Sequence, residues 1–167
     1  MANRLRGVIR FWLPVALWLG WMFFASTDVM SSEHTSRFIG PILRWWKPDI
    51  TQSAIESIQL IIRKIAHAVD YAILAGLLWR AIRHQAPMTA MPAGGQQGRS
   101  SAFVATLTFA SAIVLAVLDE FHQSFVPSRT SSARDVMIDI CGSAIGMAVC
   151  WWNELHRRKS QRISADS

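Results

Sequence analysis

Three short stretches of this 167-residue chain concentrate acidic, basic and hydrogen-bonding side chains that could bind a charged ligand or transfer a proton. Their members, in chain order, are Lys64, His67, Tyr71, Asp119, Glu120, Gln123, Arg129, Arg134, Asp135 and Asp139. Histidine changes its charge near neutral pH, so His67 could act as an acid or as a base. Lysine and arginine side chains suit phosphate and carboxylate groups. The combination is therefore suited to holding an anion and moving a proton beside it.

We assign two sets of roles from these residue types. The candidate catalytic residues, which would transfer a proton or orient a reacting group, are His67, Asp119 and Glu120. The candidate ligand-binding residues are Lys64, Tyr71, Gln123, Arg129, Arg134, Asp135 and Asp139. Two hypotheses stay open at this point. The charges either form a site that binds or modifies a ligand, or pair with one another and hold helices together.

Other kinds of site lack a supporting pattern. Glu120 and His122 are two positions apart, so they diverge on a helix, and no H-E-x-x-H or comparable metal-ligand spacing occurs. Ser124 and Ser128 lie near the candidate acid–base residues, but the chain has no G-x-S-x-G nucleophile elbow. We therefore expect no metal site and no cofactor, and covalent catalysis has little support.

The elements that must position these residues are four apolar stretches. The chain is 51% hydrophobic and only 17% charged, whereas a soluble domain carries about 25% charged residues. We predict membrane-spanning helices at about residues 8–25, 62–83, 101–119 and 135–152, each close to the roughly 20 residues that cross a bilayer. The expected fold is all-α, a single membrane domain that forms an integral membrane four-helix bundle.

The distribution of basic residues predicts the orientation of this bundle. With both termini in the cytoplasm, the cytoplasmic segments hold ten of the 17 Lys and Arg residues but two of the 11 acids. Residues 26–52 then form an outer loop, and residues 86–100 form a cytoplasmic linker that contains prolines and glycines. The net charge of +6 thus reflects membrane topology, and we expect no nucleic-acid partner.

This topology brings the three polar stretches to one level at the outer face of the membrane. Ionisable groups at such positions are costly, and they persist when they are paired or line a cavity. Two further patterns concern the helices themselves. Ser53 to Glu56 matches a capping box at the start of the second spanning helix. Gly142 and Gly146 have the G-x-x-x-G spacing that is typical of a close helix–helix contact, here expected inside the bundle.

These motifs, in this order, resemble the VanZ-like family of small bacterial membrane proteins. The resemblance covers about the C-terminal two-thirds of the chain and rests on Arg63, Lys64, Ile65, Ala66, His67, Tyr71, Asp119, Glu120, Gln123, Phe125, Pro127, Arg129, Asp135 and Gly142. Asp139 stands where the family commonly has Asn, which adds an acid to the site. The resemblance implies a multi-pass protein of the bacterial cytoplasmic membrane. The distribution of basic residues adds the expectation that its polar site faces the extracytoplasmic side.

The family takes its name from a determinant of resistance to teicoplanin, a lipid-tailed glycopeptide that targets cell-wall precursors. Many members occur outside resistance clusters, so a link to resistance is here a further hypothesis. We predict an envelope protein that binds or modifies an anionic lipid or a cell-wall precursor at the outer leaflet. Its expected partners are membrane lipids and a lipid-linked wall precursor or lipoglycopeptide. The alternative is a non-catalytic membrane scaffold, and a transporter is disfavoured because no inverted repeat is present.

Overall fold

The structure, a computed structural model, describes residues 2–26, 32–85, 101–125 and 132–165. Within these ranges the chain forms helices and no strands, which confirms the predicted all-α fold class. The helices are α1 (Ala2–Ala25), α2 (Ser32–Trp46), α3 (Gln52–Gln85), α4 (Ser101–Gln123) and α5 (Ala133–Ala165).

Four of these helices are long and apolar enough to cross a membrane. The spanning segments lie within α1, α3, α4 and α5, and they contain the four predicted spans. At about 1.5 Å of rise per residue, the 34 residues of α3 extend for roughly 50 Å. Because the hydrocarbon core of a bilayer is only about 30 Å thick, α3 must project beyond it, and so must α5 with 33 residues.

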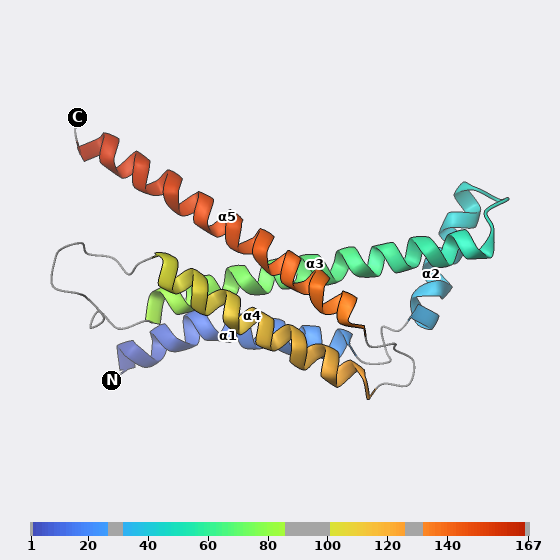
Figure 1. The fold of residues 1–167 in the computed structure, drawn as a ribbon, viewed down its shortest axis with the longest axis horizontal. Helices are drawn as coiled ribbons and strands as arrows, with labels where there is room; N and C mark the ends of the chain where they lie inside the picture. Colours follow the sequence, from blue (N-terminus) through green and yellow to red (C-terminus); the bar gives the residue numbers. More distant parts are fainter. Residues whose placement is uncertain (1, 27–31, 86–100, 126–131, 166–167) are drawn as a thin grey trace.

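The helices alternate in direction, as Figure 1 shows. Helices α1 and α4 run one way and α3 and α5 run the other way, so the two chain termini lie at the same end. The most extensive contact is between α3 and α5, while α4 packs on α5 and α3, and α1 packs on α3. The segment predicted only as an outer loop over residues 26–52 contains α2, which packs against α3 at the opposite end from the termini.

Glycines allow the backbones of α3 and α5 to approach closely. A Cβ atom at Gly142 would collide with the carbonyl oxygen of Ala68, and one at Gly146 would collide with that of Ala72. Gly142 and Gly146 of α5 therefore pack against Ala68 and Ala72 of α3. Small residues at such positions allow membrane helices to pack closely. The predicted contact through the G-x-x-x-G spacing is confirmed, and it lies inside the bundle.

The start of α3 differs from the predicted capping box. The hydroxyl of Thr51 accepts a hydrogen bond from the backbone N–H of Ala54 at 3.3 Å, which makes Thr51 the N-cap. Ser53 already lies inside the helix, and its carbonyl accepts a hydrogen bond from the Ser57 hydroxyl. The helix therefore begins two residues earlier than expected, because Thr51 supplies the same capping chemistry as Ser53 would.

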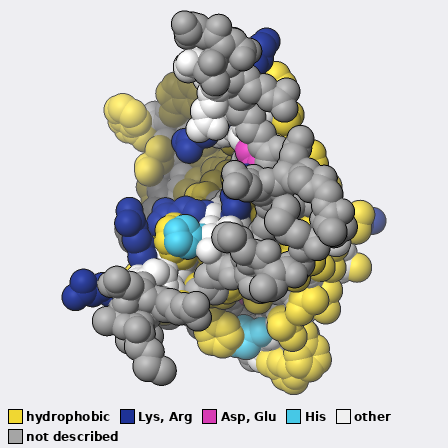
Figure 2. All heavy atoms as spheres, turned by 90° about the vertical axis from the view of Figure 1, so that its left-hand side faces the viewer, with side chains coloured by type: hydrophobic (Ala, Val, Ile, Leu, Met, Phe, Trp, Pro, Cys, Tyr) yellow, Lys and Arg dark blue, Asp and Glu magenta, His cyan; other side chains and the backbone are white. Residues whose placement is uncertain are grey.

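The end of the bundle that holds both termini is rich in basic side chains, and we call it the basic end. Figure 2 looks onto this end, where Lys and Arg side chains gather around the helix ends. Arg83 of α3 forms an ion pair with Glu154 of α5, and the hydroxyl of Ser101 on α4 donates to the same carboxylate at 2.8 Å. These contacts join three helices there. Which side of the membrane this end faces stays a prediction.

Candidate functional site

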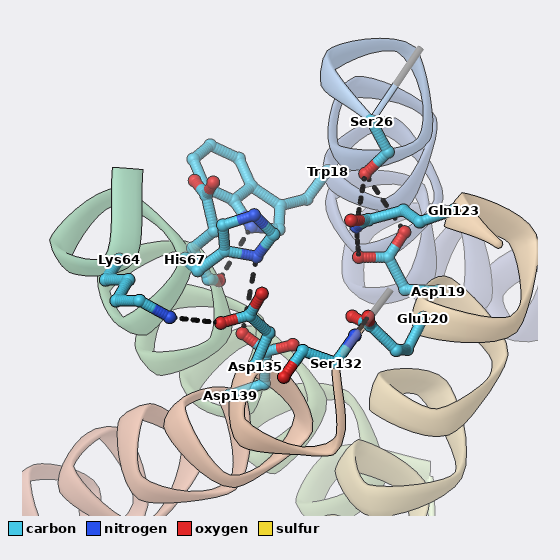
Figure 3. A network of polar contacts seen from close by, with 11 residues as sticks. Trp18, Ser26, Lys64, His67, Asp119, Glu120, Gln123, Ser132, Asp135 and Asp139 are labelled. Carbon is cyan, nitrogen blue, oxygen red and sulfur yellow. Dashed lines mark hydrogen bonds and ion pairs between the residues drawn. The ribbon is translucent and has the colours of Figure 1, made fainter. Parts of the chain in front are cut away.

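Polar side chains from four helices meet toward the opposite end of the bundle (Figure 3). We call this group the polar cluster, and its members are Ser26, Lys64, His67, Asp119, Glu120, Gln123, Ser132, Asp135 and Asp139. Seven of the predicted site residues on α3, α4 and α5 form hydrogen bonds or ion pairs within it. The sequence-based topology therefore placed residues up to about seventy positions apart in one site.

Lys64 of α3 pairs with Asp135 in the first turn of α5. The distance from Lys64 Nζ to Asp135 Oδ1 is 2.5 Å, and the Lys64 side chain is 34% exposed. The contact is a charge-assisted hydrogen bond in which the ammonium donates to the carboxylate. It neutralises an acid that would otherwise stand at a helix packing surface, so Lys64 has a structural partner as well as access to the surroundings.

His67 and Asp139 form the second link between α3 and α5. His67 Nδ1 lies 3.4 Å from Asp139 Oδ1, with the His67 side chain 18% exposed and that of Asp139 1% exposed. The position of the pair follows from the backbone contact described above, because Ala68 follows His67 directly and Gly142 lies one turn beyond Asp139. The geometry is that of an ion-pair contact, and Asp139 Oδ1 completes no hydrogen bond with the described residues.

Asp119 of α4 is held from both sides. The Ser26 hydroxyl donates to Asp119 Oδ1 at 3.0 Å, and Gln123 Nε2 donates to Asp119 Oδ2 at 3.0 Å. Gln123 Nε2 also reaches the Ser26 hydroxyl oxygen at 3.3 Å. Because Ser26 follows the last residue of α1, these bonds tie α1 to α4 and fix the orientation of the carboxylate (Figure 3).

Glu120 connects the end of α4 to the start of α5. Its carboxylate accepts a hydrogen bond from the backbone N–H of Ser132, and it is 7% exposed. The Ser132 hydroxyl in turn accepts from the backbone N–H of Arg134 at 3.2 Å, which caps the first turn of α5. Glu120 thus satisfies a backbone donor next to a helix start, a role that favours a carboxylate.

The remaining predicted residues lie at different depths. Tyr71, one turn along α3 from His67, is buried in the hydrophobic core. Arg134 is exposed at the start of α5. Arg129 lies outside the described residues, so its predicted role in anion binding stays a prediction.

The sequence did not single out three residues that support the cluster. Ser26 and Ser132 donate to its carboxylates, and Trp18 Nε1 donates to the backbone carbonyl of Asp70 at 3.0 Å. The signal for Ser26 was its place as the first polar residue after an apolar run. The signal for Ser132 was its spacing of three from Asp135, which is that of a capping motif. Trp18 carried no such signal, because any tryptophan in a spanning helix could face lipid.

The chemistry that these groups could perform follows from their arrangement. A histidine beside a buried carboxylate can exchange a proton, while exposed cations at the edge can hold an anion. The potential ligand atoms of His67, Asp119 and Asp139 also lie within 4.8 Å of one another, which is a spacing that a metal ion could bridge. The cluster can therefore bind charge of either sign, at different depths.

Four apolar helices of spanning length and a polar cluster shared among them define a multi-pass helical membrane protein. The chain matches the family described as VanZ/LLP1 over residues 11–154, and it therefore belongs to this family. This confirms the resemblance that the motifs indicated. No curated protein matches the chain, and no solved structure matches it.

Proposed function

We propose that this VanZ-like protein binds an anionic lipid or a lipid-linked cell-wall precursor at the outer leaflet of the bacterial cytoplasmic membrane. The observation that carries the proposal is that basic side chains of the polar cluster are accessible, whereas some of its acidic side chains are buried. Lys64 and Arg134 lie at its accessible edge, whereas Asp139 and Glu120 are buried. A phosphate group that approaches along the bilayer surface would meet the cations before the acids.

The orientation in this proposal follows from the basic end. Lys and Arg flanking spanning helices are retained on the cytoplasmic side, so the basic end would face the cytoplasm. The polar cluster, toward the other end of the helices, would then lie near the outer leaflet (Figure 1). This position favours a lipid headgroup or a lipid-linked wall precursor of the outer leaflet over a soluble cytoplasmic anion.

In the same proposal, Lys64 provides the main contact to the headgroup. Its Nζ has three donors, so an arriving phosphate oxygen can share the ammonium with Asp135. His67 would stand next to the bound group, with Asp139 behind it. In a reaction, His67 would move a proton to or from the headgroup. Asp119, whose carboxylate accepts hydrogen bonds from Ser26 and Gln123, would orient the headgroup.

A second candidate function is a non-catalytic membrane scaffold. The observation in its favour is that the Lys64 ammonium already has an acidic partner at 2.5 Å. In this case the cluster would join α3, α4 and α5 without taking a ligand. The two functions differ in whether the edge cations contribute to the affinity for anionic lipids.

Lipid titration of the purified full-length protein separates the two functions. Native mass spectrometry in a mild detergent would measure the binding of phosphatidylglycerol, with phosphatidylcholine as the zwitterionic reference. We expect Lys64→Gln and Arg134→Gln each to weaken phosphatidylglycerol binding by roughly three- to tenfold, the loss of one charge-assisted contact. The control is Arg157→Gln, which removes one exposed charge at the basic end. Equal affinities in all four proteins would support the scaffold.

A link to teicoplanin resistance would be a consequence of the proposed binding. A protein that holds lipid-linked wall precursors would compete with a lipid-tailed glycopeptide for its target. Expression of the chain in a susceptible bacterium should then raise the teicoplanin concentration needed to stop growth, and Lys64→Gln should remove the increase. Unchanged susceptibility would contradict the link to resistance. The proposed lipid binding would still be tested by the lipid titration.

A further inference from the structure

We propose that His67, Asp119 and Asp139 form a binding site for one divalent transition-metal ion, and that Zn²⁺ is the ion that fits best. The three residues come from α3, α4 and α5, and their potential ligand atoms lie within 4.8 Å of one another. This inference goes beyond the proposed lipid binding and does not depend on it. A cation at this position would nevertheless add to the attraction of a phosphate.

The distance between the first two ligands already matches a metal site. Zinc bonds to histidine nitrogen and carboxylate oxygen are about 2.0–2.2 Å long, so neighbouring ligands of a tetrahedral site lie roughly 3.4 Å apart. His67 Nδ1 and Asp139 Oδ1 are 3.4 Å apart. Asp119 lies within 4.8 Å of both, so a shift of about 1.4 Å or less would complete the three-ligand face.

The burial of Asp139 gives an independent reason for a cation. Its side chain is 1% exposed, and Oδ1 has no hydrogen bond from any described residue. A buried carboxylate is costly unless it is paired and hydrogen-bonded or coordinates a metal. His67 Nδ1 lies 3.4 Å from this oxygen, and the charge of Lys64 is directed to Asp135. A divalent ion between Asp119 and Asp139 would balance two carboxylates with a neutral histidine.

The carboxylate of Asp119 carries the supporting bonds that ligands of metal sites usually have. Ser26 and Gln123 each donate to one of its oxygens at 3.0 Å, which fixes its plane. Each oxygen has a second lone pair that can face an ion. Such outer partners orient ligating carboxylates and contribute tenfold to a hundredfold to metal affinity.

The ligand set also indicates the class of metal and the type of site. One imidazole and two carboxylates form a mixed nitrogen–oxygen set, which suits Zn²⁺ better than Mg²⁺ or Ca²⁺, since these prefer oxygen alone. Three protein ligands leave at least one coordination position open. Structural zinc sites use four protein ligands, whereas sites that take a water or a substrate use three. The open position would accept a water or a phosphate oxygen.

Metal content of the full-length protein tests the inference directly. The protein purified in detergent would be stripped with EDTA, equilibrated with Zn²⁺ and assayed by mass spectrometry of the metal. We expect about one Zn²⁺ per chain, and an affinity more than about 100-fold lower in His67→Ala and in Asp139→Asn, because each removes a direct ligand. The matched control is Asp49→Asn, which makes the same charge change at an exposed turn before α3 and should bind like the parent.

A measurement on the unaltered protein covers the case in which a variant does not fold. Zn²⁺ should raise the thermal unfolding temperature of the parent, because an ion that binds only the folded state stabilises it, and EDTA should reverse the rise. Co²⁺ in place of Zn²⁺ should give a visible absorption band that Zn²⁺ removes. The proposal is overturned if the parent holds no zinc above the level of Asp139→Asn, or if neither readout responds to Zn²⁺. A response to Mg²⁺ alone would overturn the assignment to zinc.

Discussion

His67 on α3 and Asp139 on α5 meet at 3.4 Å directly beside the point where Gly142 contacts the backbone of Ala68. The two site residues are 72 positions apart in the sequence, and the glycine contact is what brings them together. Helix packing and site geometry are therefore one feature in this protein. A change that separates the helices should disturb the site, even if it alters no polar residue.

Substitution Gly142→Ala tests this relationship. The added Cβ would collide with the Ala68 carbonyl oxygen, so α3 and α5 must move apart. We expect a loss of about 1–3 kcal/mol in stability, as in other overpacked contacts, measured by thermal unfolding in detergent. The matched control is Gly20→Ala on α1, where a Cβ meets nothing within 4 Å. There the higher helix propensity of alanine should leave stability equal or slightly increased. Equal effects in both variants would contradict the contact.

The Lys64–Asp135 pair is suited to a double-mutant cycle. Lys64→Met leaves a partly buried carboxylate without its cation, and Asp135→Asn leaves the ammonium without its anion. We expect each single change to destabilise the protein and the double change to cost less than their sum. The coupling should be about 0.5–3 kcal/mol, the range for residues in contact. Additive effects would show that the Lys64–Asp135 contact contributes nothing to stability.

Reporter fusions test the orientation. With the basic end in the cytoplasm, a fluorescent protein fused after the last residue should fold and fluoresce, and a periplasmic alkaline phosphatase at the same place should be inactive. A phosphatase fused after Trp46, at the end of α2, should be active. Reversed activities would place the polar cluster at the inner leaflet and would contradict the proposed lipid site.

Much of the fold follows from local patterns in the sequence. The four spans depend on hydropathy over about 20 residues, which is a property of each stretch alone. The contact at Gly142 follows from the glycine spacing. The depth of the polar residues along the bundle follows from the positions of the spans. The first turn of α3 was predicted two residues late because Thr51 and Ser53 carry similar capping groups. Capping propensity alone does not decide which of two nearby hydroxyl residues is the N-cap.

The charged members of the polar cluster were predictable from the sequence, but Ser26, Ser132 and the pairing of the side chains were not. Ionisable residues within spanning helices are rare enough to stand out, so Lys64, His67 and Asp139 were identified. Their pairing depends on how the helices are rotated about their axes, which packing decides. The expectation of no metal site rested on spacing along one helix. The three candidate ligands lie on three helices, and no spacing rule for one segment can connect them.

The glycine contact between α3 and α5 also bears on the entropy of ligand binding. Turning α5 by one residue, about 100°, would bring Cys141 or Ser143 against the carbonyl that now faces Gly142. Both carry a Cβ that this space does not accept, so the rotational register of the two helices is fixed. The conformational freedom of His67 and Asp139 relative to each other is therefore lost when the bundle folds. An ion that binds between them would meet a preorganised pair, and little of its binding free energy would be needed to bring the two side chains together.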